Sequence, residues 1–180
     1  ALNTIVDAID KIRDTASSHN RAFIVETMGR ESGYLAIQAG IVTGAELVLI
    51  PESNIEPDAV AVAIQEAYKR GKTHAIVVVA EGYHPGASEL GAMIDAMDIG
   101  FTTRVSILGH IQRGGKPSAY DRLLASRFGV KAVEFLMEGY SNVMTGLNGR
   151  EITPVPIEEV VSNTKRINPD YIHMAQILSR

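Results

Sequence analysis

The 180-residue sequence is long enough for one ordinary domain, and its 46% hydrophobic and 21% charged residues are typical of a globular protein. The formal net charge of -4 argues against broad nucleic-acid binding, which requires a basic surface, but leaves room for a local basic pocket that binds a small anion. The lack of cysteine excludes disulfides and thiolate metal sites and fits a reducing cytoplasm. No apolar stretch is long enough to span a membrane and no secretory signal is recognisable, so we expect a cytoplasmic protein with neither nucleic-acid nor membrane partners.

The first elements along the chain alternate between helix and strand. Apolar residues at positions 2, 5, 6, 9 and 12 predict a helix that ends near 17–20, and a chain that opens inside a helix suggests a fragment of a longer protein. Mostly apolar runs predict four strands, at 22–26, 46–50, 75–80 and 103–108. Helices are predicted between them, at 34–43, 58–70 (with Asp58 as a cap) and 86–97. This alternation is typical of βαβ units, so the expected fold class is α/β with a parallel sheet.

The pattern changes after Gly109. One long amphipathic helix is predicted at 121–138, and a hairpin-like segment that contains Gly and Asn follows at 141–152. The segment 154–159 is predicted to start a short helix, and a last helix is predicted at 170–179. We find no internal repeat or low-complexity tract in the sequence.

Glycine and arginine recur in the turns that follow the predicted strands. These turns hold Met28-Gly29-Arg30, Glu81-Gly82 and the run Gly109-His110-Ile111-Gln112-Arg113-Gly114-Gly115. Ligands of open α/β sheets bind beyond the carboxyl ends of the strands. Glycine lets backbone N–H groups approach an anion closely, and arginine holds phosphate through two parallel hydrogen bonds. The pattern therefore indicates a phosphate ester as ligand, with Glu81 accepting hydrogen bonds from sugar hydroxyls.

Each of these residues also has a simpler explanation. A Gly-Arg turn can be an ordinary turn with a solvated arginine, Glu81 can cap the next helix, and His110 can be a core histidine with both nitrogens satisfied. Arg21 and Arg104 lie at or near the opposite, amino-terminal ends of their strands. The residues alone therefore leave binding and structural roles open.

A second basic group includes Arg13, Arg70 and Lys72, with Glu46 and His74 close to it in the pattern. The run Lys69-Arg70-Gly71-Lys72 follows a predicted helix. Cations in that position favour the helix dipole, so a solvated helix end is the simpler interpretation of this group.

The longest motif is Ile107-Leu108-Gly109-His110-Ile111-Gln112-Arg113-Gly114-Gly115-Lys116-Pro117, which continues as Asp121-Arg122-Leu123-Leu124-Ala125-Ser126. It resembles the phosphofructokinase signature. The segments 9–19 and 25–30 match the same family in the same order. The resemblance covers essentially all 180 residues and runs to the C-terminus of the bacterial ATP-dependent 6-phosphofructokinases, so the chain resembles the C-terminal half of such an enzyme.

The resemblance implies a set of contacts to fructose 6-phosphate. Within one subunit, the family's contacts fall on Met28, Gly29, Arg30, Glu81, His110, Ile111, Gln112 and Arg113. Arg30 is also implied as a catalytic residue that offsets charge on the transferred phosphoryl group. Arg21 and Arg104 match arginines that reach the sugar phosphate of the neighbouring subunit in a homotetramer.

The resemblance also gives the second basic group a function. It implies half of an allosteric site for ADP or phosphoenolpyruvate, formed by Arg13, Gly44, Ala45, Glu46, Arg70, Lys72, Thr73 and His74. Glu46 would meet a Mg²⁺ ion that is bound to the nucleotide effector. In the whole enzyme, Mg²⁺ would also accompany the substrate ATP.

The donor side of the reaction has no counterpart in this sequence. The family's glycine-rich nucleotide loops and its Thr-Ile-Asp-Asn-Asp motif, which carries the general base, are both missing, so the chain alone is expected to be inactive. The resemblance implies a division of the chain into three parts. Residues 1–110 would form a three-layer lobe that binds the sugar phosphate and the effector, and residues 111–161 would belong to an ATP lobe that is otherwise absent. Residues 162–180 would return to the first lobe. The middle segment should therefore expose apolar surface.

Two alternatives stay open at this stage. A pyrophosphate-dependent relative is one, because the residues that select the phosphoryl donor lie outside this sequence. A non-catalytic sensor of sugar phosphate or nucleotide is the other, and it predicts binding without turnover.

Overall fold

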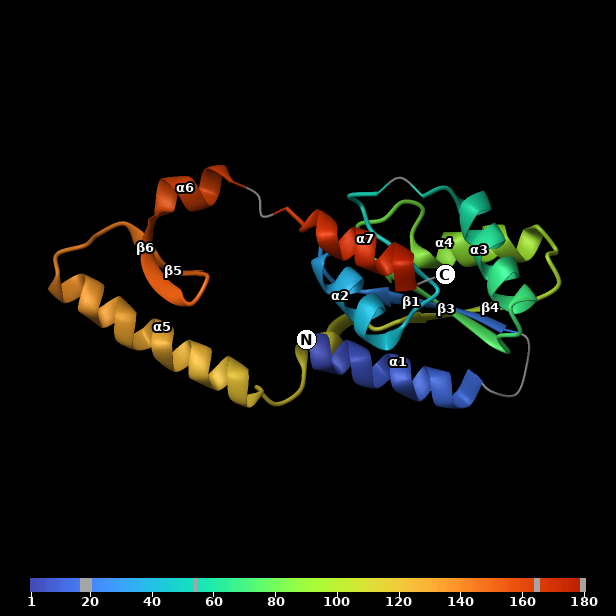
Figure 1. Ribbon diagram of the computed structural model, residues 1–180, viewed down its shortest axis with the longest axis horizontal. Helices are drawn as coiled ribbons and strands as arrows, with labels where there is room; N and C mark the ends of the chain where they lie inside the picture. Colours follow the sequence, from blue (N-terminus) through green and yellow to red (C-terminus); the bar gives the residue numbers. More distant parts are fainter. Residues whose placement is uncertain (17–20, 54, 164–165, 179–180) are drawn as a thin grey trace. The chain divides into compact units, whose positions relative to one another are not determined.

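The computed structural model describes residues 1–16, 21–53, 55–163 and 166–178 (Figure 1). The chain divides into two compact units, which are described separately. Unit 1 comprises Ala1–Gly115 and Ile167–Arg180, and unit 2 comprises Lys116–Arg166. Within the described residues, no helix combines the length and the apolar character that a membrane span requires.

Unit 1 is built on a four-stranded parallel sheet with the strand order β2-β3-β1-β4. The strands are β1 (Arg21–Thr27), β2 (Leu47–Leu49), β3 (His74–Ala80) and β4 (Thr102–Ile107). Arg21, the first residue of β1, pairs with His74 on one side and with Thr102 on the other. Because the three strands start in register, their amino ends meet at one edge of the sheet and their carboxyl ends at the other.

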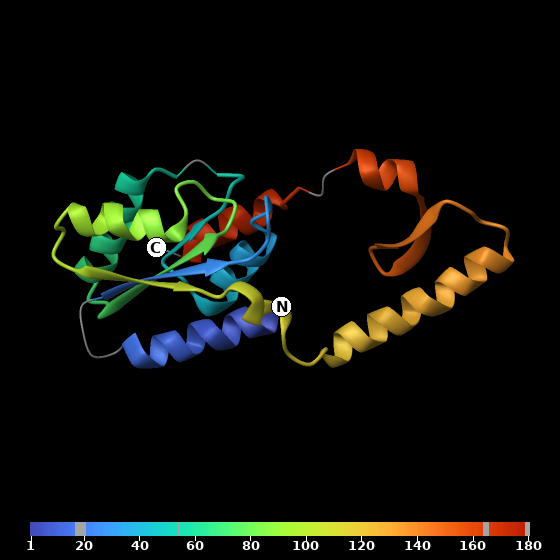
Figure 2. The ribbon, with the colours of Figure 1, turned by 180° about the vertical axis from the view of Figure 1, so that it is seen from behind.

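Helices cover both faces of this sheet. One face packs against α1 (Leu2–Ala16), α2 (Tyr34–Thr43) and α7 (Pro169–Leu178), and the other against α3 (Pro57–Lys69) and α4 (Ala87–Ala96). Figure 2 shows the blue α1 and the green α4 on opposite sides of the strands. Alternating residues of the central strands feed the two cores: Val25 and Val78 face α1 and α2, whereas Ile24 and Val77 face α3 and α4. The expected three-layer α/β fold is confirmed.

Most predicted elements are confirmed within a residue or two at each end, but three predictions need correction and one short element was not predicted. The cap of α3 is Glu56, and Pro57 occupies its first turn, so Asp58 is not the cap. The long helix α5 (Ala119–Met137) begins two residues before the predicted start, because Ser118 and Asp121 form a capping box. A short 3₁₀ helix, η1 (Gly109–Arg113), was not predicted. The predicted end of the first helix, near 17–20, lies outside the described residues.

The third correction concerns the segment 154–159, which does not start a helix at Pro154. Strand β6 (Glu151–Pro156) continues through it and pairs antiparallel with β5 (Val143–Asn148), and α6 (Ile157–Ser162) starts only afterwards. Proline lacks a backbone N–H but is accepted at the edge of a sheet, and every strand of a two-stranded hairpin is an edge strand. The hairpin is therefore longer than the sequence pattern indicated.

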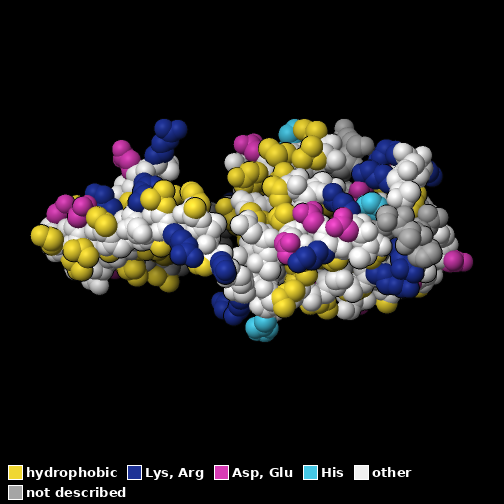
Figure 3. All heavy atoms as spheres, turned by 90° about the horizontal axis from the view of Figure 1, so that it is seen from below, with side chains coloured by type: hydrophobic (Ala, Val, Ile, Leu, Met, Phe, Trp, Pro, Cys, Tyr) yellow, Lys and Arg dark blue, Asp and Glu magenta, His cyan; other side chains and the backbone are white. Residues whose placement is uncertain are grey.

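Unit 2 consists of α5, the β5-β6 hairpin and α6. Phe135 and Ile152 are its buried large apolar side chains among the described residues. The expected exposure of apolar surface is confirmed, and Figure 3 shows hydrophobic side chains over the α5 side of this unit. The exposed ones are Tyr120, Leu123, Val130, Val133, Leu136, Met137, Tyr140, Met144, Leu147, Ile157 and Val161. The assignment of residues 111–161 to an ATP lobe stays a prediction.

Candidate functional site

The carboxyl edge of the sheet contains a crevice between the loops that leave β1 and β3. These neighbouring strands continue into helices on opposite faces, because β1 leads into α2 and β3 leads into α4. The two loops therefore diverge, and ligands of open α/β sheets bind at such a switch point. The predicted turns Met28-Gly29-Arg30 and Glu81-Gly82 form its two sides.

Glu81 ties the two loops together. Its Oε1 atom accepts the N–H of Gly29 at 3.0 Å and also the N–H of Arg30. The Glu81 N–H in turn donates to the carbonyl oxygen of Thr27 at 2.9 Å. The Gly29 and Arg30 N–H groups, followed by the positive charges of Arg113 and Arg30, lower the pKa of the Glu81 carboxyl below its ordinary 4.5. Glu81 is thus a fixed carboxylate, and the helix-cap interpretation is wrong, since the N-cap of α4 is Gly86 and it is Glu26 that accepts the N–H of Ala87 in the first turn, at 3.1 Å.

Close backbone contacts hold the crevice in this shape. A Cβ atom on Gly29 would overlap the carbonyl oxygen of Ser32, and one on Gly82 would overlap the carbonyl oxygen of Arg30. Arg30 itself adopts a positive φ of 53°, which a side-chain-bearing residue rarely does. Residues in such sparsely populated conformations cluster at binding and active sites, which supports a functional role for this turn.

Gln112 joins the η1 segment, which follows β4, to the loop that follows β1. The Gln112 amide accepts the N–H of Met28 at 2.8 Å and donates to the carbonyl oxygen of Met28 at 2.9 Å. With 2% of its surface exposed, this side chain positions the loop and is too deeply buried to meet a ligand from solvent. His110 and Arg113 on the same segment are exposed, so the interpretation of His110 as a core histidine is wrong. Ile111 is also exposed.

A cavity of about 780 Å³ opens at this crevice. Arg30 and Glu81 line it, as the sequence predicted, together with Gly82. Sequence reasoning missed its other lining residues, which are Glu31, Pro51 and His84. The rule that sites lie after strand ends could have found them, because Pro51 follows β2 and His84 lies in the loop after β3.

Arg21 and Arg104 are brought together at the other end of the sheet. Arg104 pairs in register with Phe23, two residues after Arg21 on the neighbouring strand, so both arginines project to the face covered by α1. A seven-residue strand spans roughly 20 Å, which separates Arg21 from the crevice. The structure therefore does not bring this pair to Glu81 within one chain.

The second basic group converges at the amino edge of the sheet. Arg13 on α1 donates to the carbonyl oxygen of Thr43, next to Gly44, which ends α2 with a φ of 63°. Ala45 is buried directly after this turn. Figure 3 shows Lys and Arg side chains gathered on this end of unit 1.

Glu46 is the acidic member of this group. Its carboxylate is 7% exposed and pairs with Lys72 at 2.7 Å, while its second oxygen accepts the N–H of Ile76. Thr73 Oγ1 lies 3.3 Å from Nδ1 of His74, and Arg70 caps the end of α3. Lys72 is therefore more than a solvated cation at a helix end, because its side chain, although 42% exposed, pairs with a buried carboxylate.

We searched the structure for clusters of side chains that could bind a metal ion. In the described ranges 1–16, 21–53, 55–163 and 166–178, no group of three or more His, Cys, Asp or Glu residues is arranged to hold an ion. Glu46 is a single carboxylate whose two oxygens already have partners. A Mg²⁺ ion at Glu46 would therefore have to take most of its ligands from a bound nucleotide and water.

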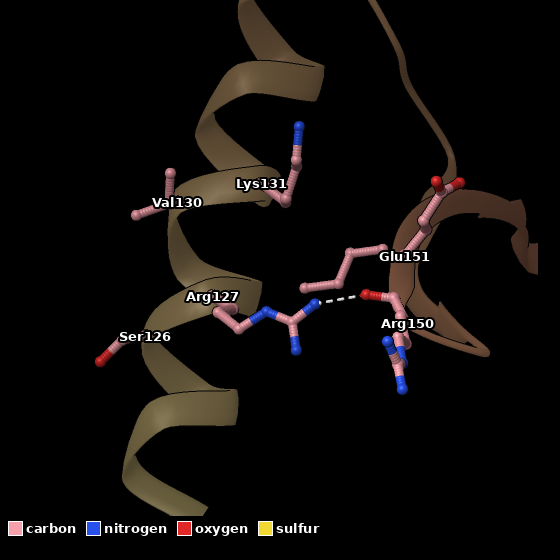
Figure 4. Close-up of a pocket in the computed structure, with 7 residues that line it drawn as sticks. Ser126, Arg127, Val130, Lys131, Arg150 and Glu151 are labelled. Carbon is pink, nitrogen blue, oxygen red and sulfur yellow. Dashed lines mark hydrogen bonds between the residues drawn. The ribbon is translucent and has the colours of Figure 1, made fainter.

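Unit 2 has a separate cavity of about 620 Å³ between α5 and the hairpin (Figure 4). Arg127 reaches across it and donates to the carbonyl oxygen of Arg150 at 2.7 Å. None of the residues predicted to bind substrate or effector lies among its lining residues, which are Ser126, Arg127, Val130, Lys131, Arg150, Glu151 and Ile152.

Comparison with known proteins identifies relatives of this sequence. The chain is 48% identical over 179 residues to the ATP-dependent 6-phosphofructokinase of Natranaerobius thermophilus and 49% identical over 178 residues to that of Thermotoga neapolitana. In both cases 99% of this chain is matched, but only 56% and 55% of the relative. The chain thus spans little more than half the length of these relatives.

Solved structures share the fold. Phosphofructokinase from Saccharomyces cerevisiae superposes with a TM-score of 0.82 at 38% identity, over 89% of this chain and 23% of that one. Pyrophosphate-dependent phosphofructokinase from Marinobacter aquaeolei superposes with a TM-score of 0.76 over 98% of this chain and 52% of that one, but at 21% identity shows the fold alone. The family model described as phosphofructokinase matches residues 1–136. With most of its length matched by that model and with the same α/β fold, this chain belongs to the phosphofructokinase family.

Proposed function

We propose that this chain is the part of an ATP-dependent 6-phosphofructokinase that binds the acceptor sugar and the effector. The whole enzyme would act in glycolysis in the cytoplasm, and it would transfer the γ-phosphate of ATP to the 1-hydroxyl of fructose 6-phosphate. The 48–49% identity to enzymes named for ATP supports ATP as donor. The matched share of those enzymes leaves room for a further half, which would supply the ATP loops and the general base.

The fixed carboxylate of Glu81 is the observation that carries this proposal. Two backbone N–H groups hold it at the switch point, and the charges of Arg30 and Arg113 lie near enough to lower its pKa. A carboxylate accepts hydrogen bonds from sugar hydroxyls, and the flanking guanidinium groups suit a phosphate. The crevice therefore has the chemistry of a sugar-phosphate site.

Each residue of the crevice then has a stated role. Arg113 and His110 hold the 6-phosphate, with the Ile111 backbone beside them, and Glu81 binds the sugar together with Met28 and Gly29. Gln112 keeps Met28 in place through its two hydrogen bonds. Arg30 offsets charge that develops on the phosphoryl group during transfer.

Arg21 and Arg104 fit a site that is shared between subunits. They lie on one face of the sheet but a strand's length from Glu81. In a homotetramer, they would reach the 6-phosphate that is bound by a neighbouring copy.

The amino edge of the sheet is proposed to bind ADP or phosphoenolpyruvate as effector. Arg13, Arg70 and Lys72 supply positive charge, and Arg13 Nε is buried without a hydrogen-bond partner among the described residues. A buried donor of this kind is expensive to leave unpaired, which favours an anion that binds there. Gly44, Ala45, Thr73 and His74 would complete this half of the site, and Glu46 would meet the Mg²⁺ of a nucleotide.

Substitution of Arg113 in the full-length enzyme that carries this sequence tests the substrate site. Loss of one charge-assisted hydrogen bond costs roughly 1.5–3 kcal/mol, so Arg113→Ala should raise KM for fructose 6-phosphate about ten- to a hundredfold. Arg113→Lys should recover only part of this loss, because lysine cannot form the bidentate contact. Lys11→Ala, which removes an exposed cation on α1, is the matched control. An unchanged KM in Arg113→Ala would refute the assignment.

Pyrophosphate is the rival phosphoryl donor, because a pyrophosphate-dependent enzyme shares this fold. Its use is decided by measuring turnover with ATP and with pyrophosphate on the same full-length preparation. Turnover with pyrophosphate but not with ATP would show that the donor is pyrophosphate. Binding of fructose 6-phosphate without turnover on either donor would show that the protein is a non-catalytic sensor.

A further inference from the structure

The turn that carries Arg30 needs contacts on both sides to keep its shape. It runs from Met28 to Gly33, the cap of α2, and the Ser32 N–H closes it by donating to the carbonyl oxygen of Gly29 at 3.1 Å. Arg30 has its positive φ inside this turn. Such a conformation is costly for a residue with a side chain and persists only where the surrounding structure holds it. The hydrogen bonds to Gln112 and Glu81 hold the start and the middle of the turn.

Glu52 holds the end of the same turn. Both of its carboxylate oxygens lie 3.1 Å from the backbone nitrogen of Gly33 and accept its N–H. Glu52 belongs to the loop that leaves β2, so it reaches the turn from a different strand than Glu81 does. A Cβ atom on Gly33 would overlap the side chain of Ile50, which is 1% exposed. The end of the turn therefore packs directly on the buried residue that follows β2.

Glu52 lies beside the crevice without lining it. Its neighbour Pro51 lines the cavity together with Arg30, but Glu52 does not. The Glu52 side chain is exposed, so water could replace it as an acceptor for the Gly33 N–H, and its removal should cost little stability. Water would not, however, fix the position of the Gly33 nitrogen. The contact is therefore suited to positioning the turn more than to stabilising the fold.

We propose that Glu52 is a positioning residue for phosphoryl transfer, because it fixes the end of the turn that presents Arg30 to the transferred group. The inference rests on the proposed role of Arg30 and adds a residue to it. The two ends of the turn then serve different steps: Gln112 holds Met28, which is proposed to contact the sugar, whereas Glu52 holds Gly33, three residues after Arg30. A displacement of a reacting group by about 1 Å can lower a rate by up to about a hundredfold.

The assignment predicts which kinetic constant changes. Arg30 acts on charge that develops only during transfer, so its displacement lowers kcat and kcat/KM by the same factor and leaves KM unchanged. Glu52→Ala should therefore lower kcat about tenfold and change KM for fructose 6-phosphate by less than about twofold. Glu52→Gln keeps an amide oxygen that can accept the Gly33 N–H, so it should recover most of kcat.

The experiment uses the full-length enzyme, with steady-state kinetics for kcat and KM and urea unfolding for stability. Glu56→Ala is the matched control, because Glu56 is an exposed carboxylate of the same loop whose side chain makes no cap hydrogen bond, and it should leave both constants unchanged. A double variant tests whether Glu52 acts through Arg30. Arg30→Ala combined with Glu52→Ala should have the kcat of Arg30→Ala alone, because no guanidinium is left to position.

Four results would overturn the proposal, and they are distinguishable. An unchanged kcat in Glu52→Ala, whatever its stability, would show that the contact with Gly33 is only structural. Equal kcat values for Glu52→Gln and Glu52→Ala would show that the hydrogen bond is not what matters. Losses that multiply in the double variant would show that Glu52 acts independently of Arg30. An unchanged kcat in Arg30→Ala would refute the proposed role of Arg30 itself, and the positioning role with it.

Discussion

The two edges of the sheet hold their carboxylates in different ways. At the carboxyl edge, Glu81 is bound by the backbone N–H groups of Gly29 and Arg30. At the amino edge, Glu46 is bound by one backbone N–H and by the side chain of Lys72. Backbone donors are fixed by the fold, whereas a half-exposed lysine can turn toward another anion. The first arrangement suits a rigid substrate site, and the second suits a site whose state changes with an effector.

The largest expected effect comes from removing the fixed carboxylate. Glu81→Ala leaves two backbone N–H groups without an acceptor and removes the contact to the sugar, and charge-assisted hydrogen bonds are worth roughly 1.5–3 kcal/mol each. We expect kcat/KM for fructose 6-phosphate to fall by at least about a hundredfold in the full-length enzyme. Steady-state kinetics measures this, with Asp10→Ala on the exposed side of α1 as the control. A decrease in kcat/KM of less than tenfold would show that Glu81 is not the fixed substrate-binding group that distinguishes the carboxyl edge from the amino edge.

The next effect tests whether Gln112 makes the carboxyl edge rigid. Gln112→Ala removes both hydrogen bonds to Met28 and leaves a space in a buried region, so the free energy of unfolding should fall by about 2–4 kcal/mol. KM for the sugar phosphate should rise although the side chain does not touch it. Urea denaturation and kinetics on the same preparation separate the two effects. A stability loss with an unchanged KM would show that the loop holds its shape without the clamp.

A smaller effect is expected at the exchangeable edge. Lys72→Met leaves the buried Glu46 charge without its ion pair, but the lysine is 42% exposed, so solvent screening limits the loss in unfolding free energy to about 1–2 kcal/mol. Substrate KM without effector should stay unchanged. Adding Glu46→Gln to Lys72→Met should recover part of the stability, because the unpaired charge is then gone. If the double variant is less stable than Lys72→Met, the loss in Lys72→Met does not come from the unpaired negative charge of Glu46.

The sheet and its switch point are predictable because local signals specify them. An unbroken apolar run such as 75–80, which is short and rich in β-branched residues, is typical of a buried strand. The alternation of strands with helices predicts that the strands of the sheet run parallel. The residues that follow the strand ends then become candidates by rule, and Glu81 and Arg30 do line the cavity.

The partners of those residues were not predictable, because they come from distant parts of the sequence. Gln112 and Met28 are 84 positions apart, so no local pattern shows that this amide clamps the loop. The same holds for Glu52, because its partner Gly33 is 19 positions away and the pattern assigned Glu52 no role. The extension of β6 through two prolines was missed because their effect depends on which strand edge they face.

The smallest expected effect is a pH dependence that belongs to Glu81. Its folded-state pKa lies below the ordinary 4.5, mainly because the N–H groups of Gly29 and Arg30 bind the charged form. A carboxyl group with a lowered pKa contributes stability above its unfolded-state pKa and loses that contribution as pH falls through the folded-state value. Glu81→Gln keeps a neutral acceptor, so its stability deficit relative to the wild type should be constant near pH 7 and shrink as pH falls below about 4.5. Urea unfolding of both proteins between neutral and acidic pH measures this difference. A stability deficit that stays the same across this pH range would show that the backbone N–H groups bind the neutral carboxyl of Glu81 as well as its carboxylate. The charge of Glu81 would then not contribute to the difference between the two edges of the sheet.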